Sequence, residues 1–85
     1  MKTNTFEQIK QILVDRFAIA ASQINPASRL QTELGMDSLD AVDLLMAINE
    51  TYRIRVPDSA LENIHTVSEL MSVVEKYRSG NKKHT

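Results

Sequence analysis

The sequence contains no cysteine and no tryptophan, and only two glycines and two prolines. Without cysteine, the protein cannot form a disulfide framework, a thiolate zinc site or a cysteine nucleophile. No apolar run approaches the ~20 residues that a membrane-spanning helix needs. The first ten residues, MKTNTFEQIK, have polar residues throughout and lack the apolar core of a signal peptide. We therefore expect no membrane span and a cytoplasmic location.

The chain is short and ordinary in composition. Its 85 residues, 42% hydrophobic and 25% charged, predict one globular domain. A chain of this size buries only about 60–65% of the surface that its unfolded state exposes, so a deep substrate cleft is not expected. We predict a single domain over residues 1–85, with an ordered core of about 4–78, a flexible tail over 79–85 and a monomeric state.

Charge is distributed unevenly along the chain. The net charge is −1, yet residues 30–52 contain five acidic residues and no lysine or arginine, so this segment carries −5 and the rest carries +4. The acidic residues are Glu33, Asp37, Asp40, Asp43 and Glu50. An acidic field favours basic protein partners and repels nucleic acid. We therefore expect protein partners and no nucleic acid.

Apolar spacing and capping signals predict three main helices. The first begins near Asn4 or Thr5 and fades over 17–21, because apolar residues recur there at three- and four-residue steps. The last begins at Thr66, which has capping-box spacing to Glu69, and glycine at position 80 is expected to end it. With one short helical turn over 59–63, the prediction is an all-α fold, a small four-helix bundle without a sheet.

The second main helix is predicted over residues 38–52, with Asp37 as its N-cap. At 3.6 residues per turn it has two apolar stripes. The first, which we expect to face the core, consists of Ala41, Leu44, Leu45, Ile48 and Tyr52. The second is interleaved with acids and consists of Leu39, Val42 and Met46, with Asp40 and Asp43 between them. This second stripe is either a partner surface or is packed under the long loop that precedes the helix.

Catalysis and metal binding by this chain are not favoured. A hydrolase would need Ser38 as the nucleophile and His65 or His84 as the base. However, the segment GMDSL lacks the second glycine of a nucleophile elbow, and no strand is predicted to lead into it. The aspartates at 37, 40 and 43 follow a helical period, whereas an EF-hand loop needs acids at alternate positions and a glycine. We therefore predict neither an enzyme nor a metal site.

Ser38 has two interpretations. It is either a structural serine that caps the helix or lies in its first turn, or it is a site of modification. A phosphate attached at a helix N-terminus would meet free backbone N–H groups and the positive end of the helix dipole. The neighbouring acids would oppose a phosphate dianion more than a singly charged phosphodiester. Spacing alone leaves both interpretations open.

The segment LGMDSLDAVDLLMAI resembles the phosphopantetheine-attachment motif of bacterial acyl carrier proteins. The similarity extends from about Phe6 to Tyr77, and VPDSALENIHTVSEL resembles the third-helix segment of that family. The resemblance implies that a phosphopantetheinyl transferase attaches 4′-phosphopantetheine from coenzyme A to Ser38, and that Asp37 flanks this attachment point. The thiol of that arm would hold acyl groups as thioesters, so the chain itself needs no cysteine.

The resemblance also implies roles for the rest of the second helix. Partner enzymes, which load, elongate and transfer acyl groups, would bind Leu39, Asp40, Val42, Asp43, Met46 and Glu50. The acyl chain would be sheltered in an interior formed by Leu44, Leu45, Ile48, Tyr52, Ile64 and Leu70. The dense acid run that usually ends this helix in fatty-acid carriers is replaced here by Asn49, Glu50 and Thr51.

This departure keeps several functions open. The chain is expected to serve fatty acid synthesis, a specialised lipid pathway or polyketide synthesis. The pair Met36-Asp37 favours an acyl over an aminoacyl or peptidyl cargo, which remains the alternative within the family. An unmodified helical adaptor that uses the acidic stripe only for docking is the alternative outside it.

Overall fold

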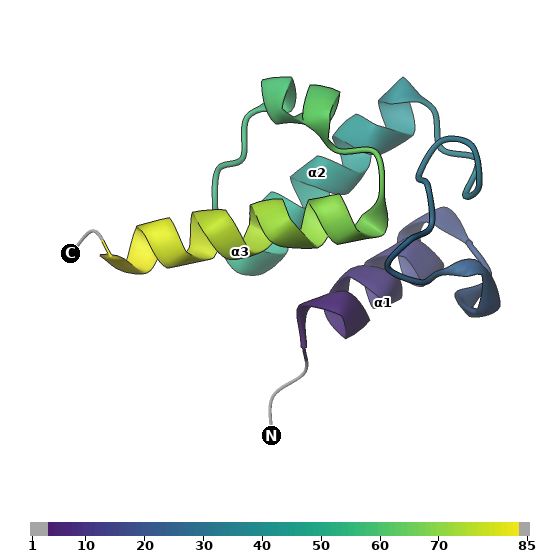
Figure 1. Ribbon diagram of the computed structural model, residues 1–85, viewed down its shortest axis with the longest axis horizontal. Helices are drawn as coiled ribbons and strands as arrows, with labels where there is room; N and C mark the ends of the chain where they lie inside the picture. The colour runs from purple at the N-terminus through teal and green to yellow at the C-terminus, as the bar shows by residue number, and fades with distance from the viewer. Residues whose placement is uncertain (1–3, 84–85) are drawn as a thin grey trace.

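The computed structural model describes residues 4–83, with side chains described over 4–78, and it is helical (Figure 1). In chain order, the elements are α1 (Thr5–Phe17), η1 (Ala21–Gln23), α2 (Ser38–Tyr52), η2 (Asp58–Asn63) and α3 (Val67–Lys83). η1 and η2 are 3₁₀-helices. No strand occurs between residues 4 and 83, where Arg29 and Thr66 form one isolated bridge. The predicted all-α fold, with three main helices and a short helix near 59–63, is confirmed, and η1 is a second short helix that the sequence pattern did not indicate.

α1 starts and stops as its sequence predicts. The Asn4 side chain accepts a hydrogen bond from the Glu7 N–H at 2.8 Å, which satisfies one of the free donors of the first turn. At the other end, Ala18 adopts the left-handed conformation with φ 56°, and its N–H donates to the Leu13 carbonyl. α1 packs against both α2 and α3.

α3 begins with the predicted capping box but does not end where predicted. The Glu69 N–H donates to Thr66 Oγ1 at 3.1 Å, and the Glu69 carboxylate accepts in return from the N–H groups of Thr66 and His65. The helix continues through Gly80 to Lys83, so the prediction that Gly80 ends it is wrong. A glycine inside a helix costs about 1 kcal/mol relative to alanine, which weakens the helix without stopping it. The flexible tail stays a prediction, and residues 84–85 lie outside the described residues.

One hydrophobic core joins the three main helices and the two connections. Seven of its side chains, those of Ile9, Leu13, Leu45, Ile48, Val67, Leu70 and Val74, are less than 2% exposed. Around them pack buried residues of the connections, among them Ile24, Leu30, Leu34, Ile54 and Val56. The long loop and the segment before η2 are therefore part of the packed core.

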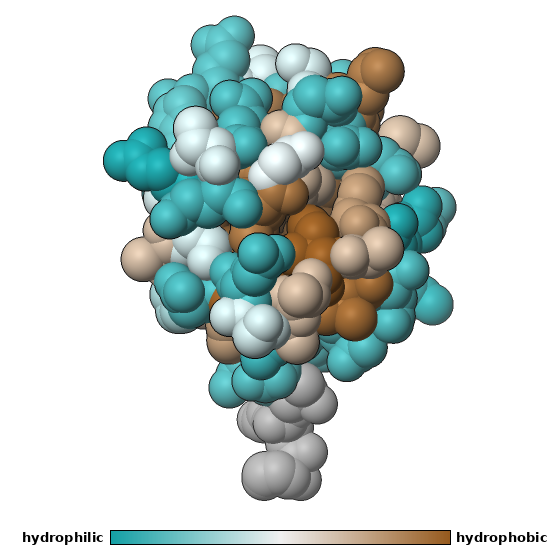
Figure 2. Space-filling model, turned by 90° about the vertical axis from the view of Figure 1, so that its right-hand side faces the viewer, coloured by the Kyte–Doolittle hydropathy of each residue, from teal (hydrophilic) through white to brown (hydrophobic). Residues whose placement is uncertain are grey.

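Backbone hydrogen bonds tie the connection over 18–37 to the start of α3. The Leu30 N–H donates to the His65 carbonyl at 2.9 Å, while the N–H groups of Val67 and Ser68 donate to the carbonyls of Ser28 and Pro26 at 3.1 and 2.8 Å. These two N–H groups belong to the first turn of α3, where a helix has no internal acceptor. The side of the molecule that carries this connection has hydrophobic residues at its centre and hydrophilic ones around them (Figure 2).

The segment between α2 and η2 is held by one side chain. Asn49, in the last turn of α2, donates from its amide to the Val56 carbonyl at 3.2 Å and accepts from the Val56 N–H at 3.0 Å. Arg53 ends α2 in the left-handed conformation with φ 57°. The chain then turns back, which places η2 against α2. None of the helices within residues 4–83 is long and apolar enough to cross a membrane.

Candidate functional site

Asp37 and Asp40 fix the start of α2. The Asp40 N–H donates to Asp37 Oδ1 at 3.0 Å, and the Asp37 N–H donates to Asp40 Oδ2 at 3.3 Å. This reciprocal pair is a capping box, with Asp37 as the predicted N-cap. Gly35, two residues earlier, lies at φ +71°, which is why a residue without a Cβ suits the turn into the helix.

Ser38 is the first residue of α2, and it is exposed. Because Asp37 performs the capping, the Ser38 hydroxyl is not needed for it, and none of the hydrogen bonds within the described residues uses this hydroxyl. Of the two structural interpretations of Ser38, the cap is therefore not supported, whereas its place in the first turn of α2 is. The exposed hydroxyl suits covalent attachment of a phosphodiester-linked group, which needs solvent access and no buried partner.

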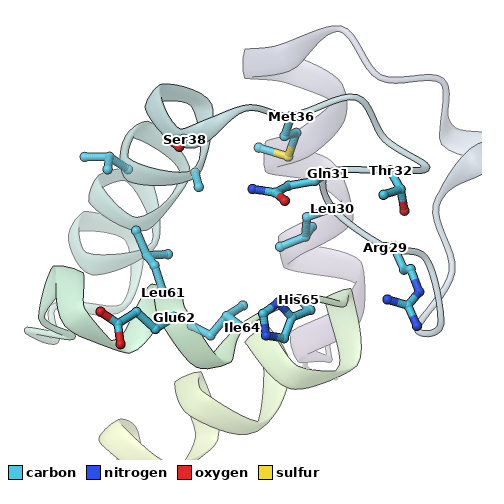
Figure 3. A pocket seen from close by; sticks show the side chains of 12 residues that line it. Arg29, Leu30, Gln31, Thr32, Met36, Ser38, Leu61, Glu62, Ile64 and His65 are labelled. Carbon is cyan, nitrogen blue, oxygen red and sulfur yellow. The ribbon is translucent and has the colours of Figure 1, made fainter.

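Ser38 lies beside a cavity of about 380 Å³ between α2, η2 and the end of the long connection. Figure 3 shows Ser38 at the top of this cavity, Ile64 and His65 at the bottom and Leu30 at the right. The apolar part of the lining consists of Leu30, Met36, Ala41, Val42, Leu61 and Ile64. Leu30, Met36 and Ile64 are buried, so the wall of the cavity is continuous with the core.

Most of the predicted interior residues belong to the core but do not line this cavity. Leu44, Leu45, Ile48 and Leu70 are buried, as predicted, yet of the six interior residues only Ile64 is part of the lining. Met36 and Leu61 line the cavity but are not among the interior residues that the sequence predicted. A signal for Met36 existed, because it occupies the position before an N-cap, where an apolar residue often packs as a hydrophobic staple. Ala41, its partner position in that motif, lines the same cavity.

Tyr52 was predicted to belong to the interior that shelters the acyl chain, but it does not line the cavity. Its side chain is half-buried, and its hydroxyl donates to Gln8 Oε1 of α1 at 2.6 Å. The Arg78 guanidinium of α3 lies 5.0 Å from the centroid of its ring. Burial raises the pKa of Tyr52 above the ordinary 10.0, the charge of Arg78 opposes this shift, and Glu75 adds to it. Tyr52 therefore joins the three helices at the edge of the core, away from the cavity lining.

The second stripe of α2 is only partly a free surface. Leu39 and Met46 are 79% and 57% exposed, so they are not packed under the loop. Val42 is half-buried and lines the cavity instead. Asp43 is paired with Arg16 of α1, with Arg16 Nη2 and Asp43 Oδ1 3.2 Å apart. Glu50 is exposed and borders a second hollow between α1 and α2.

The histidine that a hydrolase would need does not contact Ser38. His65 is exposed and lies across the cavity from Ser38 (Figure 3). No hydrogen bond joins the two side chains in the described part of the chain, and His84 lies outside it. Within residues 4–83, no group of three or more histidine, aspartate or glutamate side chains is arranged to hold a metal ion.

Comparison with known proteins agrees with this geometry. The profile of the family described as "Phosphopantetheine attachment site" matches residues 7–74. The acyl carrier protein of Helicobacter hepaticus is 38% identical over 72 residues, covering 85% of this chain and 95% of that protein. The acyl carrier protein of Picosynechococcus sp. is 36% identical over 81 residues, covering 95% and 100%. The crystal structure of an acyl carrier protein from Thermotoga maritima shares the fold, with a TM-score of 0.79 and 23% identity over 88% of this chain and 87% of that one.

These matches define the class of protein as a small helical carrier with an attachment site for phosphopantetheine. The chain belongs to the acyl carrier protein family. Its cofactor is covalently attached 4′-phosphopantetheine, and the protein is a non-catalytic carrier that a separate transferase modifies. The resemblance that the sequence motif indicated is confirmed.

Proposed function

We propose that Ser38 carries the 4′-phosphopantetheine arm and that the protein delivers acyl intermediates, held as thioesters on this arm, to partner enzymes. The observation that supports this most is the Ser38 hydroxyl, which is exposed at the start of α2 and free of capping because Asp37 performs that task. When attached, the arm supplies the thiol that a chain without cysteine lacks.

The cavity beside Ser38 suits an acyl chain. Its buried walls at Leu30, Met36 and Ile64 are apolar, and an alkyl chain that leaves water gains about 0.8 kcal/mol for each buried CH₂ group. An aminoacyl group would gain less from these apolar walls, and its charged amine would need the polar part of the lining, which includes Gln31 and Glu62. We therefore propose an acyl cargo, for fatty acid, specialised lipid or polyketide synthesis. The cytoplasmic location and the monomeric state stay predictions.

Partner docking is proposed for the outer side of α2. Leu39 and Met46 are large apolar side chains in contact with water, and Asp40, Asp43 and Glu50 lie on the same helix. An apolar centre with charged residues around it is the usual composition of a protein interface. Val42 contributes to this face only in part, since it also lines the cavity. The transferase, and enzymes that load, elongate or transfer acyl groups, are the proposed partners.

The first prediction tests the attachment site. The unmodified protein, incubated with coenzyme A, Mg²⁺ and a phosphopantetheinyl transferase, is expected to gain the mass of one phosphopantetheine group. Ser38→Ala is expected to abolish this gain completely, because the acceptor hydroxyl is lost. Intact-mass spectrometry measures both results.

The matched control is Ser59→Ala, which removes another exposed serine hydroxyl, in η2, and is expected to be modified like the wild type. Circular dichroism checks that both variants keep their helical content. A Ser38→Ala variant that still gains the mass would contradict the assignment to Ser38. A wild-type protein that several transferases leave unmodified would contradict the proposed carrier function.

A further inference from the structure

The acids on the outer side of α2 are not equally available to a partner. The Asp40 carboxylate accepts from the Asp37 N–H within the capping box. The Asp43 carboxylate accepts a hydrogen bond from the Arg16 guanidinium, 3.2 Å away. The two side chains of this pair are 48% and 49% exposed, so the pair lies at the surface where a partner would approach. Two of the three acids proposed for partner contact are therefore already engaged within the chain.

The position of Arg16 explains why the pair forms. Arg16 lies in the last turn of α1, where the negative end of the helix dipole favours a positive side chain. α1 packs against α2, and this packing brings the end of α1 to the side of α2 that carries Asp43. Arg16 also borders the second hollow between these helices, together with Glu50. A positive charge from α1 is thus part of the otherwise acidic face of α2.

We propose that Arg16 is a specificity determinant of the α2 docking face. A partner lysine or arginine that approaches Asp43 must share this carboxylate with Arg16 or displace Arg16. The positive charge of Arg16 also repels the approaching partner residue. A partner that binds chiefly through Leu39 and Met46 meets no such opposition, because both side chains are exposed. Arg16 therefore favours partners with an apolar docking surface over partners that depend on basic residues opposite Asp43. This inference rests on the proposed function.

The test uses the transferase reaction as the docking assay. The rate of mass gain, expressed as kcat/KM, is measured at low salt with a transferase whose activity on another acyl carrier protein falls as salt rises, which marks it as a partner that binds through basic residues. Arg16→Ala frees Asp43 for the partner. It is expected to raise kcat/KM about two- to fivefold, a change of the size that the free energy of one exposed ion pair produces. The gain is expected to shrink at high salt, where exposed charges are screened.

Two further variants distinguish an effect of the Arg16–Asp43 pair from the effect of removing any positive charge from α1. Lys10→Ala removes one positive charge from the same helix, where the Lys10 ammonium lies 5.7 Å from the Phe6 ring centroid, and it is expected to change kcat/KM little. The double variant, Arg16→Ala with Asp43→Asn, is expected to have the same kcat/KM as Asp43→Asn alone, because Arg16 then has no carboxylate to occupy. The three results together support the proposal.

Three results would overturn it: an unchanged kcat/KM for Arg16→Ala, an equal gain for Lys10→Ala, or a gain that persists with Asp43→Asn. In each of these cases the wild type still gains mass, so the carrier function stands and only the role of Arg16 fails. A wild type without any mass gain would instead contradict the proposed function itself.

Discussion

At the scale of single residues, Asn49 accounts for one unusual feature of the sequence. The run of acids that usually ends this helix in fatty-acid carriers is interrupted here by an asparagine. In the structure, its amide both donates to the Val56 carbonyl and accepts from the Val56 N–H. A carboxylate can only accept. The asparagine is therefore suited to hold the segment before η2, whatever its effect on partner choice.

The corresponding prediction concerns Asn49→Asp. This change keeps the size of the side chain but removes the donor and places a carboxylate next to the Val56 carbonyl. We expect the free energy of unfolding to fall by about 1–3 kcal/mol, the cost of leaving a buried polar group without its partner. Urea unfolding followed by circular dichroism measures the loss. Asn63→Asp, at an exposed position at the end of η2, is the control and is expected to lose less than about 0.5 kcal/mol. Equal losses for both variants would contradict the role of the amide.

At the scale of elements, the start of α3 predicts a pH dependence. Hydrogen bonds from the backbone N–H of His65, and then of Thr66, hold the pKa of Glu69 below its ordinary value of 4.5, although burial opposes the shift. Because the folded state favours the ionised carboxyl, this contribution to stability is present above the ordinary pKa. It is lost as the pH falls through the lower pKa of the folded state.

Glu69→Gln tests this contribution. Glutamine can still accept the hydrogen bonds of the capping box through its side-chain oxygen, but it does not titrate. We expect the wild type to lose more thermal stability than the variant when the pH is lowered from neutral to below 4.5. Unfolding midpoints measured across this range give the difference. Parallel curves for the two proteins would show that Glu69 does not contribute in this way.

At the scale of the whole molecule, stability depends on a core shared by three helices and two connections. Ile48, in the second half of α2, is fully buried. Ile48→Ala is expected to lower the free energy of unfolding by about 2–5 kcal/mol, because it leaves a cavity in the packed core. Met46→Ala, on the exposed side of the same helix, is the control and is expected to change it by less than about 0.5 kcal/mol. Chemical unfolding of both variants measures the contrast, and a small loss for Ile48→Ala would contradict the assignment of the core.

Local features could be predicted from the sequence because their partners lie within a few residues. The caps at Asn4, Asp37 and Thr66 each join a side chain to an N–H three residues later, so the starts of all three main helices were predicted. The cavity wall at Met36 depends on how separate elements pack. The pair of Arg16 and Asp43 joins residues 27 positions apart, and no local pattern indicates it.

The ties between the long connection and α3 have a consequence for opening motions. The amide protons of Leu30, Val67 and Ser68 are bonded across the two segments, and Leu30 and His65, which share one of these bonds, also line the cavity beside Ser38. Hydrogen exchange at these three amides therefore reports a single event, in which the connection separates from α3 and the cavity wall opens. Comparing their exchange rates in the loaded and unloaded protein would measure whether an acyl group on the arm changes how often this wall opens.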